Sequence, residues 1–286
     1  MTPIARLFVL SLLAIAVVGR PALAEFTDDD YARHIEALKQ RLPRDGFTII
    51  VQKPFVVIGD EKPDVVRSRS IRTVKWAVDR LKATYFDKDP DVILNVWLFK
   101  DKDSYQTNTH KLFNDKPTTP FGYYSRRHKA LIMNIATGGG TLVHEIVHPF
   151  VEANFPKCPA WFNEGLGSLY EQCGDKDGRI WGHTNWRLAG LQKAIDRGDV
   201  PTFKDLCSTT TAQFYYKDRG TNYAQARYLL YYLQQRGLLD SYYETFTKNH
   251  ENDPTGYESL KAVLKTDDMA AFQKDWERFV MKLRYP

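Results

Sequence analysis

The chain has 286 residues, a formal net charge of +5 and 43% hydrophobic residues. This length supplies enough apolar surface for one sizeable domain or two lobes. The basic residues are scattered and no basic block is interleaved with aromatic residues, so the sequence does not predict a nucleic-acid-binding protein. Beyond the N-terminal region, no apolar stretch is long enough to cross a bilayer.

The first 24 residues have the pattern of a secretory signal peptide. Arg6 precedes an apolar run over residues 7–18, and Ala22-Leu23-Ala24 matches the small-residue cleavage pattern. The run is shorter than the about 20 residues of a membrane-spanning helix. We therefore expect an exported protein, periplasmic or secreted, with no stable membrane anchor after cleavage behind Ala24. An uncleaved N-terminal anchor is the alternative.

Helical and strand patterns alternate from residue 25 to residue 140, which predicts an N-terminal α/β lobe. Apolar residues at helical spacing predict a long helix over residues 63–85. Further helices are expected at 28–42 and 103–113, and strands at 47–58, 92–99, 121–125 and 129–135. The last of these strands is expected to be an edge strand beside a cleft.

From residue 141 to residue 286, nearly every segment has a helical pattern, which predicts a mainly helical lobe. Thr141 is expected to cap a helix over 142–154, and Pro149 to kink that helix or to end its regular part. Other helices are expected at 160–172, 185–196, 222–236 and 268–283. The chain is therefore predicted to be an α+β protein with its functional site at the junction of the lobes, where clefts form.

The most informative segment is residues 144–148, His-Glu-Ile-Val-His, an HExxH motif in a predicted helix. Two histidines four positions apart lie on one face of a helix, so both imidazoles can bind one metal ion. A catalytic Zn²⁺ takes three protein ligands and leaves the fourth position to water. Glu145 is rotated by about 100° from His144 and can act on that water as a general base. The motif predicts His144 and His148 as zinc ligands.

The predicted third ligand is Glu164, in Trp-Phe-Asn-Glu-Gly at residues 161–165. Glu164 follows His148 by 164 − 148 = 16 positions. Prolines between the two residues allow a turn, so that a second helix can fold back against the first. Gly165 and Gly167 would let these two helices approach closely. These features together predict zinc-dependent hydrolysis.

Residues 121–171 resemble the gluzincin metallopeptidases, particularly the small bacterial MA-like peptidases. The resemblance implies a zincin-like fold and hydrolysis of a peptide or protein substrate by a zinc-activated water. It also implies that His144, His148 and Glu164 hold the zinc and that Glu145 is the base. Related enzymes hold an extended peptide along an edge strand through main-chain hydrogen bonds.

The resemblance further implies an oxyanion-stabilising Tyr or His downstream of the motif. Tyr223, at the start of a predicted helix, is the first candidate, and His183 is the second. The acidic residue with which gluzincin aminopeptidases bind a free amine is missing from residues 132–137, which favours an endopeptidase. Thermolysin-like enzymes carry an Asp four residues after the third ligand, whereas this chain has Ser168 there. We therefore expect that another residue orients the zinc-binding histidine, or that this histidine is held less firmly.

Two other interpretations of the motif stay open. The first is a non-catalytic zincin-fold protein that binds a peptide or a partner. The second is a structural zinc site, which would need a fourth protein ligand such as Cys158. Cys158, Cys173 and Cys207 form no C-x-x-C pair. A Cys173–Cys207 disulfide is the preferred interpretation, and three unpaired thiols are the alternative. The oligomeric state is not predicted.

Overall fold

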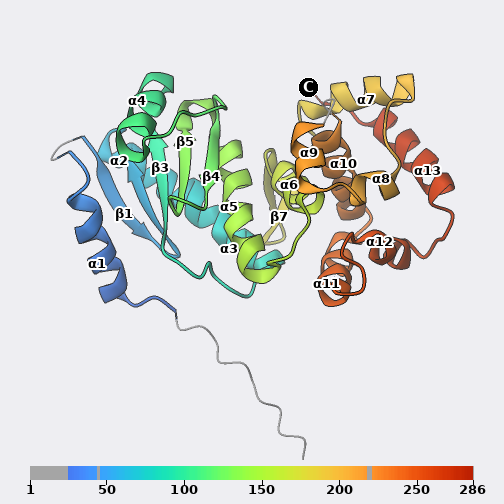
Figure 1. The fold of residues 1–286 in the computed structure, drawn as a ribbon, viewed down its shortest axis with the longest axis horizontal. Coiled ribbons are helices and arrows are strands. Elements are labelled where there is room, and N and C mark those ends of the chain that lie inside the picture. Colours follow the sequence, from blue (N-terminus) through green and yellow to red (C-terminus); the bar gives the residue numbers. More distant parts are fainter. Residues whose placement is uncertain (1–24, 44–45, 218–220, 286) are drawn as a thin grey trace, which may run out of the picture.

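The computed structural model describes residues 25–43, 46–217 and 221–285. It has a β-sheet at one end and a group of helices at the other (Figure 1). The mixture of helices and strands is compatible with the predicted α+β class. The signal peptide predicted for residues 1–24 lies outside the described residues. Within the described ranges, no helix combines the length and the apolar character that a bilayer crossing requires.

The sheet has five strands in the order β1-β2-β3-β5-β4. They are β1 (Thr48–Gln52), β2 (Phe55–Gly59), β3 (Leu94–Phe99), β4 (Gly122–Ser125) and β5 (Ala130–Asn134). The three central strands are parallel, and β1 and β4 pair antiparallel at the edges. The strand predicted over 47–58 is therefore a hairpin of β1 and β2.

The prediction that residues 129–135 form an edge strand is wrong. The chain turns back after β4, so that β4 takes the edge and β5 lies inside the sheet. All five residues of β5 are buried and four of them are apolar. Such a continuous apolar run is typical of a strand that is covered on both faces.

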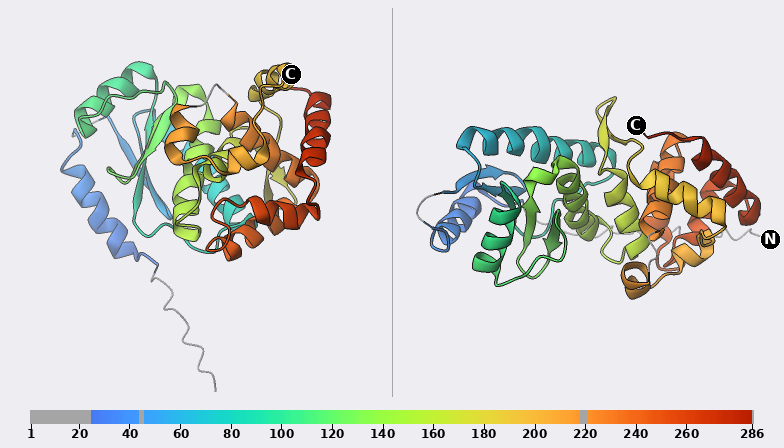
Figure 2. Two further views of the ribbon diagram at one scale, coloured as in Figure 1. Left: turned by 45° about the vertical axis from the view of Figure 1, so that its right-hand side comes forward. Right: turned by 90° about the horizontal axis from the view of Figure 1, so that it is seen from above.

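Helices cover both faces of the sheet (Figure 2). Alternate strand residues point to opposite faces. Val57 and Leu131 belong to the core on one side, with buried residues of α2 (Pro63–Arg69), η1 (Ser70–Lys75), α3 (Trp76–Thr84) and α5 (Gly139–Asn154). Ile58 and Ile132 pack on the other side with α1 (Asp28–Lys39) and α4 (Lys102–Phe113). The helix predicted over 63–85 consists of α2, η1 and α3 in succession, and its middle section, η1, is π-helical.

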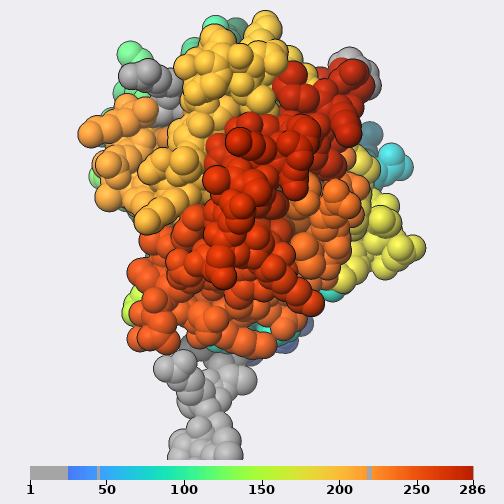
Figure 3. Space-filling model, turned by 90° about the vertical axis from the view of Figure 1, so that its right-hand side faces the viewer, coloured from blue at the N-terminus to red at the C-terminus, as the bar shows by residue number. Residues whose placement is uncertain are grey.

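The rest of the chain is mainly helical. Its helices are α6 (Ala160–Leu169), α7 (Arg187–Arg197), α8 (Phe203–Cys207), α9 (Thr211–Tyr216), α10 (Asn222–Gln235), α11 (Leu239–Asn249), α12 (Tyr257–Leu264) and α13 (Met269–Lys282). The C-terminal helices, coloured red, form much of the outer surface at this end of the molecule (Figure 3). The short helices α8, α9, α11 and α12 were not predicted. Nor was the hairpin of β6 (Cys173–Lys176) and β7 (Arg179–Gly182), whose second strand contacts α3.

Helix α5 lies between the sheet and α6, and buried residues from both ends of the molecule form one continuous hydrophobic cluster. The helix begins at Gly139 and not after Thr141, because Gly138 adopts a φ of 107° that turns the chain into the helix earlier. Pro149 does not end the helix, which continues to Asn154.

Candidate metal centre

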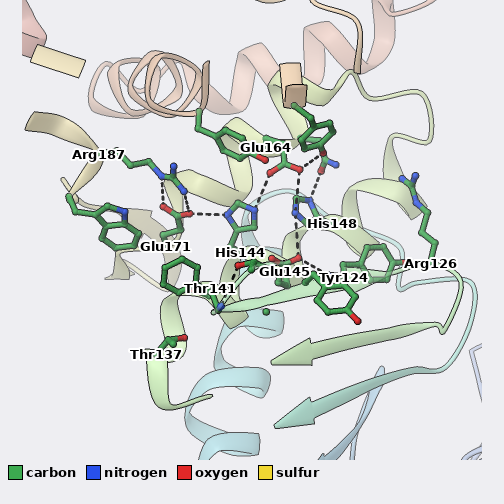
Figure 4. A pocket seen from close by; sticks show the side chains of 18 residues that line it. Tyr124, Arg126, Thr137, Thr141, His144, Glu145, His148, Glu164, Glu171 and Arg187 are labelled. Carbon is green, nitrogen blue, oxygen red and sulfur yellow. Dashed lines mark hydrogen bonds and ion pairs between the residues drawn. The ribbon is translucent and has the colours of Figure 1, made fainter. Parts of the chain in front are cut away.

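The packing of α5 against α6 brings the two motif histidines opposite Glu164 (Figure 4). His144 Nε2 lies 3.2 Å from Glu164 Oε2, and His148 Nε2 lies 3.8 Å from Glu164 Oε1. All three side chains are buried. The structure therefore brings together the three residues that the sequence predicts as metal ligands.

Glu145 lies beside the same group. Its Oε2 is 3.8 Å from His148 Nε2 and accepts a hydrogen bond of 2.9 Å from the backbone amide of Tyr124 on edge strand β4. The ligand atoms of His144, Glu145 and His148 lie within 4.8 Å of one another, so this group could hold a metal ion. The edge strand thus positions the carboxylate that sequence reasoning predicts as the base.

The separations and the charges fit a divalent cation. Two ligand atoms at about 2.0–2.2 Å from a tetrahedral metal lie roughly 3.4 Å apart, close to the 3.2 Å between His144 Nε2 and Glu164 Oε2. His148 Nε2 lies 3.8 Å from the other carboxylate oxygen, Glu164 Oε1. With neutral histidines, the carboxylates of Glu145, Glu164 and Glu171 and the guanidinium of Arg187 give a formal charge of −3 + 1 = −2 around the two imidazoles. A divalent ion would neutralise that charge.

Glu171 supplies the support that Ser168 does not give. Its Oε1 lies 3.3 Å from His144 Nδ1 and accepts a hydrogen bond of 2.6 Å from Arg187 Nη2. Arg187 Nε and Asn185 Nδ2 donate to the other carboxylate oxygen, at 2.9 Å and 3.0 Å. The sequence analysis missed Glu171, although it follows Glu164 by seven positions, which is two helical turns.

A glycine allows this approach of Glu171 to α5. Gly140 lies in the first turn of α5, and a Cβ atom there would overlap the backbone oxygen of Glu171. Gly167 has a similar role, because a Cβ atom at that position would lie 3.1 Å from the His144 ring. Gly165, in contrast, faces Ala226 of α10, so only Gly167 has the predicted role between α5 and α6.

His148 also has a partner for its second ring nitrogen. His148 Nδ1 lies 3.0 Å from Asn163 Oδ1. An amide oxygen can only accept, so Nδ1 carries the proton and Nε2 keeps its lone pair for a metal. Asn163 directly precedes Glu164, so one turn of α6 contributes both a predicted ligand and the group that orients another.

The neighbouring charged groups lower the pKa values of the two carboxyl groups and raise the pKa of the imidazole between them. Burial alone would raise the pKa of Glu164, but the charge of His148 and the hydrogen bond with His144 outweigh it and lower that pKa to about 2. Burial is likewise outweighed at Glu171, where the hydrogen bond from Arg187 helps to lower the pKa to about 2. Burial would lower the pKa of His144, but its hydrogen bond with Glu164 and the nearby carboxylate of Glu171 raise it. The site therefore favours positive charge between these carboxylates.

The candidate metal centre forms one wall of a cavity of about 960 Å³. Tyr223 lines this cavity, and its burial and the charge of Glu164 raise the pKa of its hydroxyl. Tyr215 lines it too, and its hydroxyl donates a hydrogen bond to Glu164 Oε1. Sequence reasoning missed Tyr215, because the many tyrosines after residue 214 give no signal that separates one from another. His183, the second oxyanion candidate, is exposed beside Gly174 of β6 and does not line the cavity.

The cysteines do not take part in the metal centre. All three are unpaired, so the preferred Cys173–Cys207 disulfide is wrong: Cys207 is buried in α8, whereas Cys173 lies on the β6–β7 hairpin. Cys158 does not line the cavity, and its Sγ faces the backbone oxygen of Pro159 at 3.6 Å. Cys158 therefore does not supply the fourth protein ligand that a closed structural site would need.

No protein-family model matches the chain, and no curated protein matches its sequence.

Proposed function

We propose that the protein is an exported zinc-dependent metallopeptidase of zincin-like fold, related to the gluzincins, which cleaves peptide bonds within a chain. The main support is the convergence of His144, His148 and Glu164 on one wall of a large cavity, with Glu145 beside them. Two imidazole nitrogens and one carboxylate oxygen are a donor set of catalytic zinc sites that keep one position open.

The side chains around the centre have separate tasks in this proposal. A bound zinc ion would lower the pKa of a water molecule and polarise the substrate carbonyl. Glu145, held by the amide of Tyr124, would take a proton from that water and later deliver it to the leaving amine. The hydroxyl of Tyr223 donates a hydrogen bond to the carbonyl oxygen as negative charge develops on it.

The carboxylates that line the cavity favour cleavage within a substrate chain over removal of its N-terminal residue. They are Glu145, Glu164 and Glu171. The last is held by Arg187 and Asn185, and the first two have roles in hydrolysis. Among the described lining residues, no further carboxylate is therefore left to bind the amino terminus of a substrate.

The experiment is metal analysis of the purified protein together with cleavage of a peptide library with and without a chelator. We expect one zinc per chain and chelator-sensitive cleavage. Glu145→Gln should keep the zinc and lose nearly all turnover, whereas His148→Ala should lose the metal. His110→Ala, on an exposed position of α4, is the matched control and should change neither property.

Two results would contradict the proposal. Wild-type turnover of Glu145→Gln would exclude the general-base role, and absence of stoichiometric metal would exclude the zinc site. Stoichiometric zinc without cleavage of any peptide would instead indicate a non-catalytic peptide- or partner-binding protein.

A further inference from the structure

A buried arginine of α10 lies against α6 and has no part in the proposed chemistry. Arg227 is fully buried, and its hydrogen-bond partners in the described chain are all main-chain carbonyl oxygens. Burial lowers the pKa of its guanidinium to about 10. Its Nη1 atom is buried as well and has no hydrogen-bond partner among the described residues. A buried cation that only carbonyl groups stabilise is costly, so the position of Arg227 needs a reason beyond the filling of space.

Arg227 binds the end of the helix that carries Glu164. Its Nε donates a hydrogen bond of 2.9 Å to Ser168 O and its Nη2 one of 3.3 Å to Leu169 O, and these are the last two residues of α6. Carbonyl groups in the last turn of a helix have no partner within the helix and carry partial negative charge. Ser168 O also accepts a hydrogen bond of 3.3 Å from the backbone amide of Glu171. Arg227 therefore fixes the same carbonyl group to which the main chain of Glu171 is bonded.

Arg227 and its neighbour Tyr228 also hold the segment between β7 and α7. Arg227 Nη2 donates a hydrogen bond to His183 O. The hydroxyl of Tyr228 accepts a hydrogen bond of 3.0 Å from the backbone amide of Asn185 and donates one of 3.2 Å to the carbonyl oxygen of the same residue. Tyr228 and Asn185 are both fully buried. Side chains of α10 thus fix the main chain of residues 183–185, which belongs to no helix or strand.

This segment leads directly to the groups that hold Glu171. Asn185 Nδ2 donates to Glu171 Oε2 at 3.0 Å, and Arg187 donates to both carboxylate oxygens, at 2.9 Å and 2.6 Å. Figure 4 shows this carboxylate between the guanidinium of Arg187 and the ring of His144, whose Nδ1 lies 3.3 Å from Glu171 Oε1. A continuous chain of polar contacts therefore joins α10 to the candidate ligand His144 through the carboxylate of Glu171.

We propose that Arg227 and Tyr228 are positioning residues of the metal centre, which hold the end of α6 and the segment before α7 so that the carboxylate of Glu171 stays against His144. This inference rests on the zinc site of the proposed function and not on the reaction that the site performs. Neither residue lines the cavity, so neither contacts a metal ion or a substrate there. We expect their effect on the metal to pass through Glu171, because that carboxylate contacts the ligand ring.

The test is the zinc affinity of the full chain, measured by competition with a chromophoric chelator. Arg227→Met removes the charge and the three hydrogen bonds but keeps a long side chain. It should weaken zinc binding by about 10-fold, the lower end of the range for groups that orient metal ligands. Arg227→Lys keeps a charge that can donate to a carbonyl oxygen, so it should recover part of that loss. Tyr228→Phe removes only a hydroxyl group and should weaken zinc binding too, and it decides the test if Arg227→Met does not fold.

Double variants separate positioning from a general loss of stability. Glu171→Gln removes the charge of the carboxylate, so Arg227→Met or Tyr228→Phe in that background should weaken zinc binding little further. Tyr242→Phe is the control, because the hydroxyl of Tyr242 is also buried and donates to a main-chain oxygen, that of Gly256, outside the cavity. It should lower stability toward denaturant and leave the zinc affinity unchanged.

Wild-type zinc affinity in both Arg227→Met and Tyr228→Phe would overturn the inference. Losses that multiply in full with the loss of Glu171→Gln would overturn it as well, because the two residues would then act by another route. Crystal structures of the variants give a readout that needs no metal. The carboxylate of Glu171 should have moved away from His144, and a retained separation of 3.3 Å in both variants would overturn the inference. Absence of stoichiometric zinc from the wild type would instead exclude the proposed function, and the crystal structures alone would then decide the positioning role.

Discussion

Glu171 Oε1 lies 3.3 Å from His144 Nδ1, whereas Glu164 Oε2 lies 3.2 Å from the other ring nitrogen of the same imidazole. His144 is thus held between two carboxylates that come from α6 and from the residues just after it. A carboxylate on the second nitrogen of a ligand histidine fixes the ring and increases its basicity. We therefore assign Glu171 a positioning role in the proposed zinc site.

The first prediction tests that role. Glu171→Gln keeps the shape of the side chain but removes its charge, and it should weaken zinc affinity by about 10-fold to 100-fold. Competition with a chromophoric chelator measures this change. Glu152→Gln is the control, because Glu152 lies on α5, the helix that carries His144, but bonds Tyr124 and Arg126. Equal affinities of the two variants and the wild type would contradict the role of Glu171.

The second prediction separates the two tyrosines of the cavity. Tyr223→Phe should lower kcat by about 10²-fold to 10³-fold with zinc retained, because it removes a donor to the developing oxyanion. Tyr215→Phe should weaken zinc binding more than it lowers kcat, because its hydroxyl donates to Glu164. Steady-state kinetics and zinc titration of both variants measure these effects, with Tyr231→Phe, outside the cavity, as the control. The reverse pattern would make Tyr215 the oxyanion donor.

The third prediction concerns the close approach at Gly140. Gly140→Ala should destabilise the protein by about 1–3 kcal/mol, because the added methyl group overlaps the backbone oxygen of Glu171. Gly190→Ala, in α7, has open space around the new methyl group and should stabilise by up to about 1 kcal/mol, since Ala favours a helix more than Gly does. Denaturant unfolding of both variants measures the difference. Equal stability of the two would show that the backbone at Gly140 can move.

The fourth prediction concerns the thiols. Burial raises the pKa of Cys173 to about 12 and raises the pKa values of Cys158 and Cys207 as well. The thiolate is the reactive form, so alkylation of the native protein should be slow at pH 8. Its rate at Cys173 should rise with pH as the thiolate fraction increases toward pH 12. In denaturant, alkylation and mass spectrometry should find all three cysteines modified, whereas a single modified cysteine would indicate a disulfide.

Much of the metal centre could be predicted because its parts are local in sequence. The helical period alone places His144 and His148 on one face, and the short connection rich in proline brings Glu164 back toward them. The long helices and the central strands were predicted for the same reason, since each shows its own apolar period.

The remaining features depend on contacts between residues that are distant in sequence. Whether β4 or β5 forms the sheet edge depends on which strand pairs with β3, and either segment has a plausible strand pattern. Tyr215 and Glu171 reach the site only because α9 and the end of α6 pack where they do. Local periodicity thus predicts the helices and the candidate metal-binding motif. The edge strand and the partners of the candidate ligands follow from tertiary packing, because many non-local contacts must be satisfied together.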